Sequence, residues 1–134
     1  MIEKRIKILV VEDENEACKY IASHLRRRGY DALMANSAEE ALSIIKEQNP
    51  DLVLLDIYLP GMSGIDLLKL VRDFNTKIKV VIMSGYLGSF LDDLQFKGLG
   101  VLEFIEKPMS FTTLDSALER IAREEKNGHT QINS

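Results

Sequence analysis

Five short apolar runs alternate with five segments whose apolar residues recur at helical spacing, and this alternation constrains the fold more than any other feature. The apolar runs, interpreted as strands, are Ile6–Val11, Asp31–Ala35, Leu52–Leu55, Lys79–Met83 and Val101–Ile105. The helical segments are centred on Cys18–Leu25, Ala38–Ile45, Ile65–Val71, Leu87–Leu94 and Phe111–Ile121. Strands that alternate with helices in this way predict a parallel sheet with helices packed on both faces.

The repeated strand–helix unit predicts an α/β protein of the doubly wound class. Because crossovers between parallel strands are right-handed, few topologies remain for five strands. We expect the flavodoxin-like (βα)5 arrangement with strand order 2-1-3-4-5. With 134 residues, the chain has the length of one domain. We assign residues 1–123 to this domain and residues 124–134 to a polar tail or the start of a linker.

Several helices are preceded by residues that commonly cap helix N-termini. Asn15, Ser63 and Ser110 are each expected to be an N-cap, because their side chains can accept a hydrogen bond from the first helical turn. Ser37 followed by Glu40 matches the capping-box pattern. These residues therefore predict where four of the five helices begin.

Composition excludes several classes of protein. The formal net charge of −4 argues against a nucleic-acid-binding surface. Cys18 is the only cysteine, so an internal disulfide and a cysteine metal cage are both excluded. No apolar run has the length of a membrane span, and the N-terminal residues lack the apolar centre of a signal peptide. We expect no direct contact with nucleic acid or membrane, and a reducing cytoplasm as the compartment.

Acidic residues follow two strands that the expected topology makes neighbours. Glu12 and Asp13 follow the first strand, and Asp56 follows the third. Ligands of such sheets bind beyond the carboxyl ends of the strands at the topological switch point, so these three carboxylates should share one crevice. Two carboxylates ~4 Å apart repel by about 4 kcal/mol at an effective dielectric of ~20, which favours a bound cation. Carboxylate oxygens select Mg²⁺, or Mn²⁺, over zinc.

Further polar residues follow the fourth and fifth strands. Ser84 and Gly85 come after the fourth, and Glu106, Lys107 and Pro108 come after the fifth. A lysine ammonium and a serine hydroxyl both suit a phosphoryl group. Mg²⁺ commonly binds one or two carboxylates together with phosphate oxygens, and aspartate can accept a phosphoryl group. This edge of the sheet therefore suggests phosphate chemistry.

Four short motifs resemble those of the receiver domain of two-component response regulators. They are Glu12-Asp13, Asp56 with the following LPGMSG, Ser84-Gly85 and Lys107-Pro108. Each motif alone is weak, but all four occur in order at the ends of the appropriate strands. The resemblance covers about residues 5–123, which is nearly the whole chain.

The resemblance implies a phosphoacceptor and a metal site. Asp56 would be the nucleophile that accepts a phosphoryl group from a phosphohistidine. Asp13 would bind Mg²⁺ directly, and Glu12, where the family more often has Asp, would bind it through a metal-bound water. The Asp56 carboxylate and the backbone carbonyl of Tyr58 would supply the other protein ligands.

The resemblance also implies roles for residues near the end of the chain. Ser84 would hydrogen-bond a phosphoryl oxygen, and Lys107 would pair with the acceptor carboxylate at rest and with the phosphate afterwards. Gly85 and Pro108 would be positioning residues, with a cis peptide before Pro108 that aims the lysine. Phe104 stands where the family has a switch aromatic, and without a hydroxyl it would act by packing alone.

The partners implied by the resemblance are a phosphoryl donor and an output. A sensor histidine kinase or phosphotransfer domain would be the donor. The added charge would draw in Ser84 and Lys107, admit Phe104 to the vacated space and reshape the surface of the fourth helix, fifth strand and fifth helix. A downstream effector domain or protein, or a second copy in a homodimer, would bind that surface. The chain is then a signalling phosphoacceptor rather than an enzyme, with only self-phosphorylation and slow autodephosphorylation.

Two tyrosines are expected to modulate the phosphoryl lifetime. Tyr58 and Tyr86 lie two residues beyond Asp56 and Ser84, where their side chains can flank the phosphoryl group. Bulky rings at these positions would hinder the approach of water. We therefore expect a longer phosphoryl lifetime than with small side chains.

Two other functions fit parts of the pattern. A receiver-like binding module that works without phosphorylation usually lacks the acceptor aspartate or the lysine, and both are present here. A phosphohydrolase of the haloacid dehalogenase type, which uses an aspartate nucleophile, needs a second aspartate where Tyr58 stands, and a cap domain for which this chain has no room. The sequence does not specify the cognate kinase, the regulated process, the oligomeric state or whether the chain is free-standing.

Overall fold

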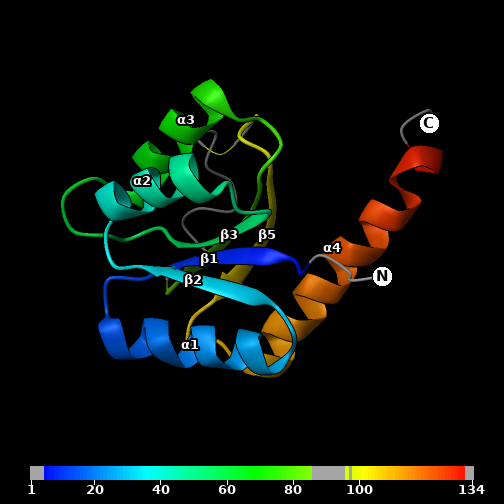
Figure 1. Cartoon of the computed structure of the whole chain (residues 1–134), viewed down its shortest axis with the longest axis horizontal. Coiled ribbons are helices and arrows are strands. Elements are labelled where there is room, and N and C mark those ends of the chain that lie inside the picture. Colours follow the sequence, from blue (N-terminus) through cyan, green and yellow to red (C-terminus); the bar gives the residue numbers. More distant parts are fainter. Residues whose placement is uncertain (1–4, 86–95, 97, 132–134) are drawn as a thin grey trace.

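A single parallel sheet organises the computed structural model (Figure 1), which describes residues 5–85, 96 and 98–131. Its strand order is β2-β1-β3-β4-β5. The strands are β1 (Lys7–Val11), β2 (Asp31–Ala35), β3 (Leu52–Asp56), β4 (Lys79–Ser84) and β5 (Val101–Glu106). The helices of the described residues are α1 (Asn15–Arg27), α2 (Ala38–Gln48), α3 (Gly64–Phe74) and α4 (Phe111–Gln131). The predicted doubly wound fold with strand order 2-1-3-4-5 is confirmed.

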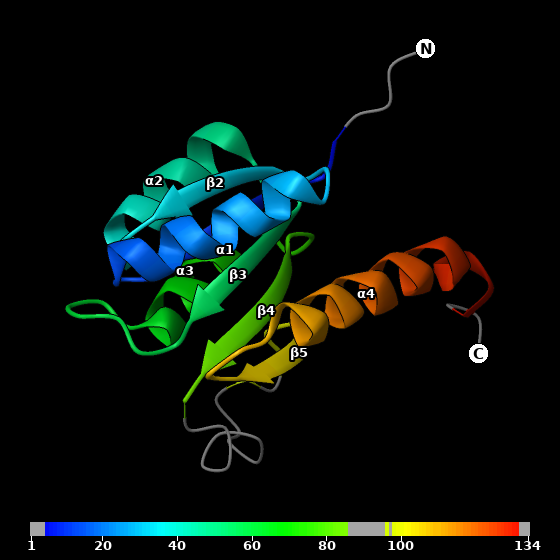
Figure 2. The ribbon, with the colours of Figure 1, turned by 90° about the horizontal axis from the view of Figure 1, so that it is seen from below.

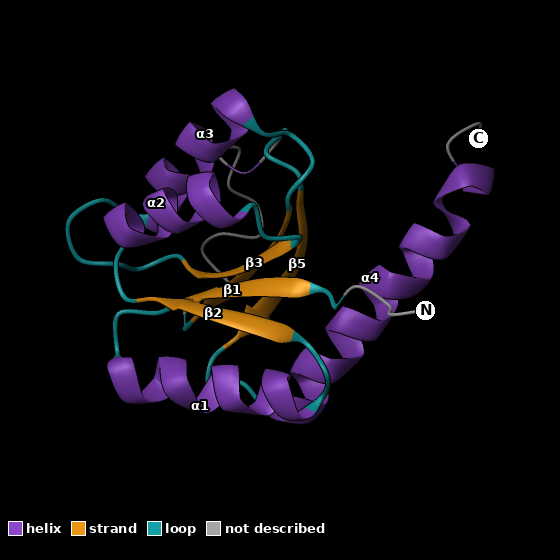
Figure 3. Cartoon of the chain, in the orientation of Figure 1, coloured by secondary structure: helices purple, strands orange, loops and turns teal. Residues whose placement is uncertain are grey.

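Helices cover both faces of the sheet, as Figures 1 and 3 show: α2 and α3 lie on one face, and α1 and α4 on the other. Side chains alternate between the faces along each strand. Leu9 and Val11 of β1 belong to the core under α2 and α3. Ile8 and Val10 belong to the core under α1 and α4. This two-sided burial explains why the strands read as continuous apolar runs.

Three strands extend one residue beyond their apolar runs. β3, β4 and β5 end at Asp56, Ser84 and Glu106, so these polar residues are the last residues of strands rather than the first residues of loops. The neighbouring strands supply the pairing, because Asp56 lies opposite Met83 and Ser84 lies opposite Glu106. Their backbones are therefore fixed by the ladder.

Most of the predicted helix caps are confirmed. The Ser37, Ser63 and Ser110 side chains accept hydrogen bonds from backbone N–H groups three residues later, at 3.1, 3.2 and 3.1 Å. The prediction of Asn15 as a cap is wrong, because Asn15 is the first residue of α1 and Glu14 occupies the N-cap position without a side-chain cap bond. The helix begins one residue earlier than predicted.

The last helix differs most from expectation. The backbone of α4 remains helical to Gln131, beyond residue 123, and projects past the edge of the sheet in Figures 1 and 2. The helix predicted around Leu87–Leu94 falls outside the described residues. Within the part of the chain that the structure describes, no helix combines the length and apolar composition needed to cross a membrane.

Candidate functional site

The buried acidic residues of the site come from the two central strands. Val11, the last residue of β1, pairs with Leu55 of β3, and the next residue along the chain after each of them is acidic. Glu12 is 3% exposed and Asp56 5% exposed, whereas Asp13 is exposed. One carboxylate oxygen from each of the three lies within 4.8 Å of the others. The predicted convergence of Glu12, Asp13 and Asp56 is therefore present in the structure.

A lysine from the far end of the chain lies between two of these carboxylates. The Lys107 ammonium donates to Glu12 Oε2 at 2.7 Å and to Asp56 Oδ2 at 2.8 Å. Its backbone N–H donates to the carbonyl of Ser84 at 2.8 Å, and the peptide bond to Pro108 is cis. The lysine is thus held at the ends of β4 and β5 while its side chain reaches β1 and β3.

The close grouping of charges changes the protonation of the site. Burial raises the pKa of the Glu12 carboxyl to about 7, a rise that the hydrogen bond from Lys107 limits and that the Asp56 carboxylate increases. Burial alone would lower the pKa of Lys107, but its hydrogen bonds to Asp56 and Glu12 and their charges raise it above the ordinary value. The lysine therefore stays charged near neutral pH, while Glu12 is near the midpoint of its titration.

Both carboxylate oxygens of Asp56 accept a hydrogen bond. Oδ1 accepts a hydrogen bond from the backbone N–H of Tyr58 at 3.0 Å, while Oδ2 accepts from Lys107. These two bonds orient the carboxylate in the crevice. A charged acceptor with donors on both oxygens has little rotational freedom.

Gly64 contributes to the site and was not identified from the sequence. Its N–H donates to the Ile57 carbonyl at 3.0 Å, which brings the start of α3 against the end of β3. A Cβ on Gly64 would lie 2.7 Å from the Asp56 carbonyl oxygen and 2.9 Å from Ile57 Cα. A glycine is therefore needed for this approach. The signals in the sequence were its place at the end of the LPGMSG motif and its position next to the Ser63 cap.

The remaining predicted residues lie around this centre or outside the described residues. Ser84 is fully buried at the end of β4, and Gly85 is exposed beside it. Phe104 is half-buried, and its ring packs edge-on against Phe96 with centroids 5.4 Å apart. Tyr58 is 53% exposed. Its partner in the lifetime prediction, Tyr86, is outside the described residues, and that part of the hypothesis stays a prediction.

The donor set fits a hard divalent cation. Three carboxylates from two strand ends offer oxygen ligands within a few ångströms of each other, two of them buried. Mg²⁺ prefers such ligands and also retains water, which the exposed position of Asp13 allows. Glu12, Asp13 and Asp56 are therefore the residues that would hold the metal.

A cavity of about 450 Å³ adjoins this centre between α1 and the loop before α4. Glu12 and Lys107 of the site line it. The rest of the wall is largely apolar or aromatic and consists of Glu14, Ala17, Tyr20, Ile21, Pro108, Met109 and Phe111. The cavity therefore reaches the candidate site at Glu12 and Lys107.

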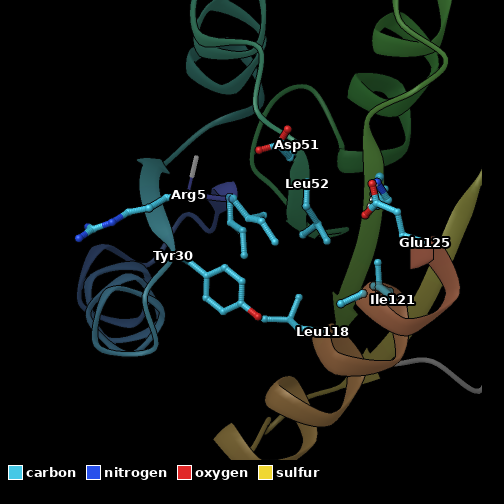
Figure 4. A pocket seen from close by; sticks show the side chains of 11 residues that line it. Arg5, Tyr30, Asp51, Leu52, Leu118, Ile121 and Glu125 are labelled. Carbon is cyan, nitrogen blue, oxygen red and sulfur yellow. Dashed lines mark ion pairs between the residues drawn. The ribbon is translucent and has the colours of Figure 1, made fainter. Parts of the chain in front are cut away.

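Another cavity, of about 200 Å³, lies at the opposite end of the strands (Figure 4). Tyr30, Leu118 and Ile121 line it, and an ion pair of 3.3 Å between Lys79 and Glu125 lies at one side. None of the predicted site residues lines this cavity. In Figure 2 the arrowheads of β3, β4 and β5 mark the C-terminal ends of these strands, and these strands end at Asp56, Ser84 and Glu106.

Comparisons with known proteins agree with this geometry. The family model for the response regulator receiver domain matches residues 8–119. The transcriptional regulatory protein ZraR of Escherichia coli K12 is 37% identical over 120 residues, which are 90% of this chain and 27% of ZraR. The sporulation initiation phosphotransferase F of Bacillus subtilis is 35% identical over 115 residues, which are 85% of this chain and 91% of that protein. The chain thus spans about a quarter of ZraR but matches nearly all of the sporulation protein.

A solved structure shows the same fold. The response regulator TrrA of Thermotoga maritima, solved in complex with Mg²⁺ and BeF, superposes with a TM-score of 0.77 at 30% identity, covering 85% of this chain and 96% of that one. The sheet order, the grouped carboxylates and the family match lead to one conclusion. This chain belongs to the response regulator receiver domain family of two-component phosphorelay signalling.

Proposed function

We propose that this receiver domain accepts a phosphoryl group on Asp56 from the phosphohistidine of a sensor histidine kinase or phosphotransfer domain. The carrying observation is the Asp56 carboxylate itself, buried at the end of a central strand, bonded to Lys107 at 2.8 Å and grouped with Glu12 and Asp13. One carboxylate oxygen forms the new O–P bond while the N–P bond to the imidazole breaks. The imidazole retains the electron pair and takes up a proton, so the transfer is balanced without redox change.

Glu12, Asp13 and Asp56 would hold Mg²⁺, with the Tyr58 carbonyl as a further ligand. The metal would neutralise charge on the transferred group. Supporting this assignment, TrrA, which shares 30% identity with this chain, was solved with Mg²⁺ and BeF. The two buried carboxylates and the exposed Asp13 provide oxygen ligands without a further cofactor.

Lys107 and Ser84 would bind the transferred group. The Lys107 ammonium already forms an ion pair with the Asp56 carboxylate. Only a short displacement would therefore bring it into contact with a phosphoryl oxygen. Ser84 ends the neighbouring strand, and its carbonyl accepts the backbone N–H of Lys107 at 2.8 Å. Because this backbone hydrogen bond joins the two residues, a movement of Ser84 would also move Lys107.

The output would be carried by β5, α4 and the helix predicted around Leu87–Leu94. Phe104 lies on β5 opposite Ile82, two residues before the Ser84–Glu106 pair, and would follow a movement of Ser84 by packing. On the same strand, Leu102 is 43% exposed and Glu103 forms a two-bond ion pair with Arg120 of α4. An effector domain or protein, or a second copy, would bind this surface in the phosphorylated state.

The presence of the complete acceptor set favours phosphorylation over a phosphorylation-independent binding module. The proposal is of a signalling phosphoacceptor rather than a turnover enzyme. Incubation with acetyl phosphate and Mg²⁺, followed by electrophoresis on a phosphate-retarding gel, should shift the wild type and not Asp56→Ala. The exposed Asp73 of α3 provides a matched control, and Asp73→Ala should shift like the wild type.

Three outcomes would contradict the proposal. A wild type that is not retarded would favour the binding module. Retardation of Asp56→Ala would show that the acceptor is another residue. Repeated turnover of a phosphomonoester would favour the phosphohydrolase.

A further inference from the structure

The backbone of Glu12 is held on both sides by the end of β2 and the residue after it. Its N–H donates to the Ala35 carbonyl at 3.0 Å, which continues the ladder one step beyond the last pair, Val11 and Ala35. Its carbonyl accepts a hydrogen bond from the side-chain amide of Asn36, with Nδ2 2.9 Å from the oxygen. The Asn36 side chain thus supplies the next hydrogen bond where the pairing of β1 with β2 ends.

The Asn36 side chain replaces a strand partner here because the chain turns into α2. The backbone N–H of Asn36 donates to the Glu40 carboxylate at 2.7 Å and is not directed at Glu12. The chain therefore leaves the sheet at Asn36, and the Glu12 carbonyl is beyond the reach of regular pairing. Glu12 is 3% exposed, so little water is available to replace the amide donor.

The bonded carbonyl belongs to the peptide group that joins Glu12 to Asp13. Fixing this peptide plane fixes the directions in which both side chains leave the backbone. One of these side chains bonds Lys107 at 2.7 Å, and both contribute oxygens to the three-carboxylate cluster. A rotation of the peptide group would move both carboxylates relative to Asp56.

We propose that Asn36 is a positioning residue for the acidic pair, acting through the peptide group between Glu12 and Asp13. This inference rests on the proposed magnesium-dependent function of the same site. Loss of the amide donor should leave the fold in place and weaken the binding of Mg²⁺. Outer residues that orient metal ligands commonly contribute 10–100-fold to metal affinity, and because Asn36 acts through the backbone we expect on the order of tenfold.

The neighbouring Ser37 provides a control for a merely structural role. Its hydroxyl caps α2 by accepting the Glu40 N–H at 3.1 Å, and none of the side-chain hydrogen bonds found for Ser37 joins it to Glu12. Ser37→Ala should therefore lower the urea midpoint of unfolding while leaving the metal ligands oriented. Asn36→Ala removes the amide and keeps both the Ser37 cap and its own backbone bond to Glu40.

The experiment titrates Mg²⁺ into the metal-stripped 134-residue chain as wild type, Asn36→Ala, Asn36→Leu and Ser37→Ala. Binding is followed by NMR shifts of backbone amides. Urea unfolding in EDTA is measured on the same samples. Asn36→Leu keeps the side-chain size without a donor and serves if the alanine variant does not fold. The expected result is about tenfold weaker Mg²⁺ binding in the Asn36 variants and affinity within about twofold of wild type in Ser37→Ala.

Two results would overturn this inference but not the proposed function. One is unchanged Mg²⁺ affinity in the Asn36 variants, and the other is an equal loss of Mg²⁺ affinity in Ser37→Ala. In either case a wild type that binds Mg²⁺ and is phosphorylated leaves the proposed function intact. A wild type that binds no Mg²⁺ would overturn both the inference and the metal requirement of the proposed function.

Discussion

Lys107 and Glu12, 95 residues apart in the chain, meet through a hydrogen bond of 2.7 Å between the ammonium and Oε2. The same ammonium bonds Asp56 at 2.8 Å, so one lysine serves two buried carboxylates. The lysine side chain is 30% exposed, while the side chains of its partners are 4% and 7% exposed. The Lys107 ammonium therefore reaches the site from the more exposed side of the site and compensates the charge of carboxylates that water cannot reach.

Removal of this cation should destabilise the metal-free protein. Lys107→Met leaves two buried carboxylates without their shared partner, and breaking a buried pair costs about 3 kcal/mol or more. We expect a loss of this order in the free energy of unfolding, measured in urea with EDTA at pH 8. Arg120→Met, which breaks a more exposed and solvent-screened pair with Glu103, should lower the free energy of unfolding much less than Lys107→Met does. Equal losses in the two variants would contradict the buried role of Lys107.

The raised pKa of Glu12 makes stability depend on pH. The folded protein holds a proton on Glu12 up to about pH 7, whereas the unfolded chain loses it near 4.5. Between these values the folded state binds more protons, so this group lowers the stability as the pH rises, and the effect levels off above about pH 7.

Glu12→Gln should remove that dependence. In EDTA, the free energy of unfolding of Glu12→Gln relative to wild type should increase from pH 5 to pH 7 and then stay constant. Urea unfolding at pH 5, 6, 7 and 8 measures this difference. A difference that is flat over the whole range, or that falls with pH, would show that Glu12 is not buried in the unfavourable charged form.

Replacement of the acceptor aspartate should relieve repulsion when the metal is absent. Asp56→Asn leaves Lys107 paired with Glu12 and removes one of three neighbouring carboxylates. We expect a higher Tm than wild type in EDTA, and a smaller gain in Tm on addition of Mg²⁺, because the variant binds the metal less tightly. A lower Tm for the variant in EDTA would mean that the bond from Lys107 to Asp56 outweighs the repulsion.

Gly64 should not tolerate a side chain. In Gly64→Ala the new Cβ would lie 2.7 Å from the Asp56 carbonyl, and both close neighbours are backbone atoms that cannot rotate away. We expect a loss of about 1–3 kcal/mol in the free energy of unfolding, as for other overpacked sites, measured in urea. Gly85→Ala is the stability control, since a Cβ there would meet no atom of the described residues within 4 Å. A stable Gly64→Ala would show that α3 can move away from β3 without cost.

Tyr58 should lengthen the life of the phosphorylated state. Its side chain is exposed, and its backbone N–H bonds the acceptor carboxylate at 3.0 Å. We expect Tyr58→Asn to admit water and speed the loss of phosphate by about fivefold, which is about 1 kcal/mol in the barrier. The decay of the retarded band after removal of acetyl phosphate measures this rate. Phe74→Asn, at an aromatic residue of 47% exposure on α3, is the control. Equal decay of wild type and Tyr58→Asn would contradict the hypothesis.

Residues at strand ends were predictable because their position follows from periodicity and topology alone. A continuous apolar run predicts a buried strand, and parallel strands place their C-terminal residues at one edge. Glu12, Asp56 and Ser84 could therefore be grouped from the order of residues along the chain. Ser37, Ser63 and Ser110 were predictable for a similar reason, since capping depends on residues three positions apart.

Contacts that depend on distance across the fold were not predictable. The Asn36 amide on the Glu12 carbonyl, the closeness of Gly64 to Asp56 and the second bond of Lys107 to Glu12 join segments whose separation no local pattern encodes. The wrong N-cap at Asn15 has a similar origin. Asn15 and the actual cap, Glu14, are adjacent polar residues, and the path of the chain away from β1 decides which of them starts the helix.

The order of strands and helices and the identity of the charged residues follow from the amino-acid sequence, because they depend on local periodicity and on residue type. The balance of those charges follows only from the packing of the folded chain. Lys107 reaches both carboxylates because β1 and β3 are adjacent and β5 ends at the same edge, and burial there raises the pKa of Glu12. Charge compensation is a property of distances of a few ångströms, and only packing sets those.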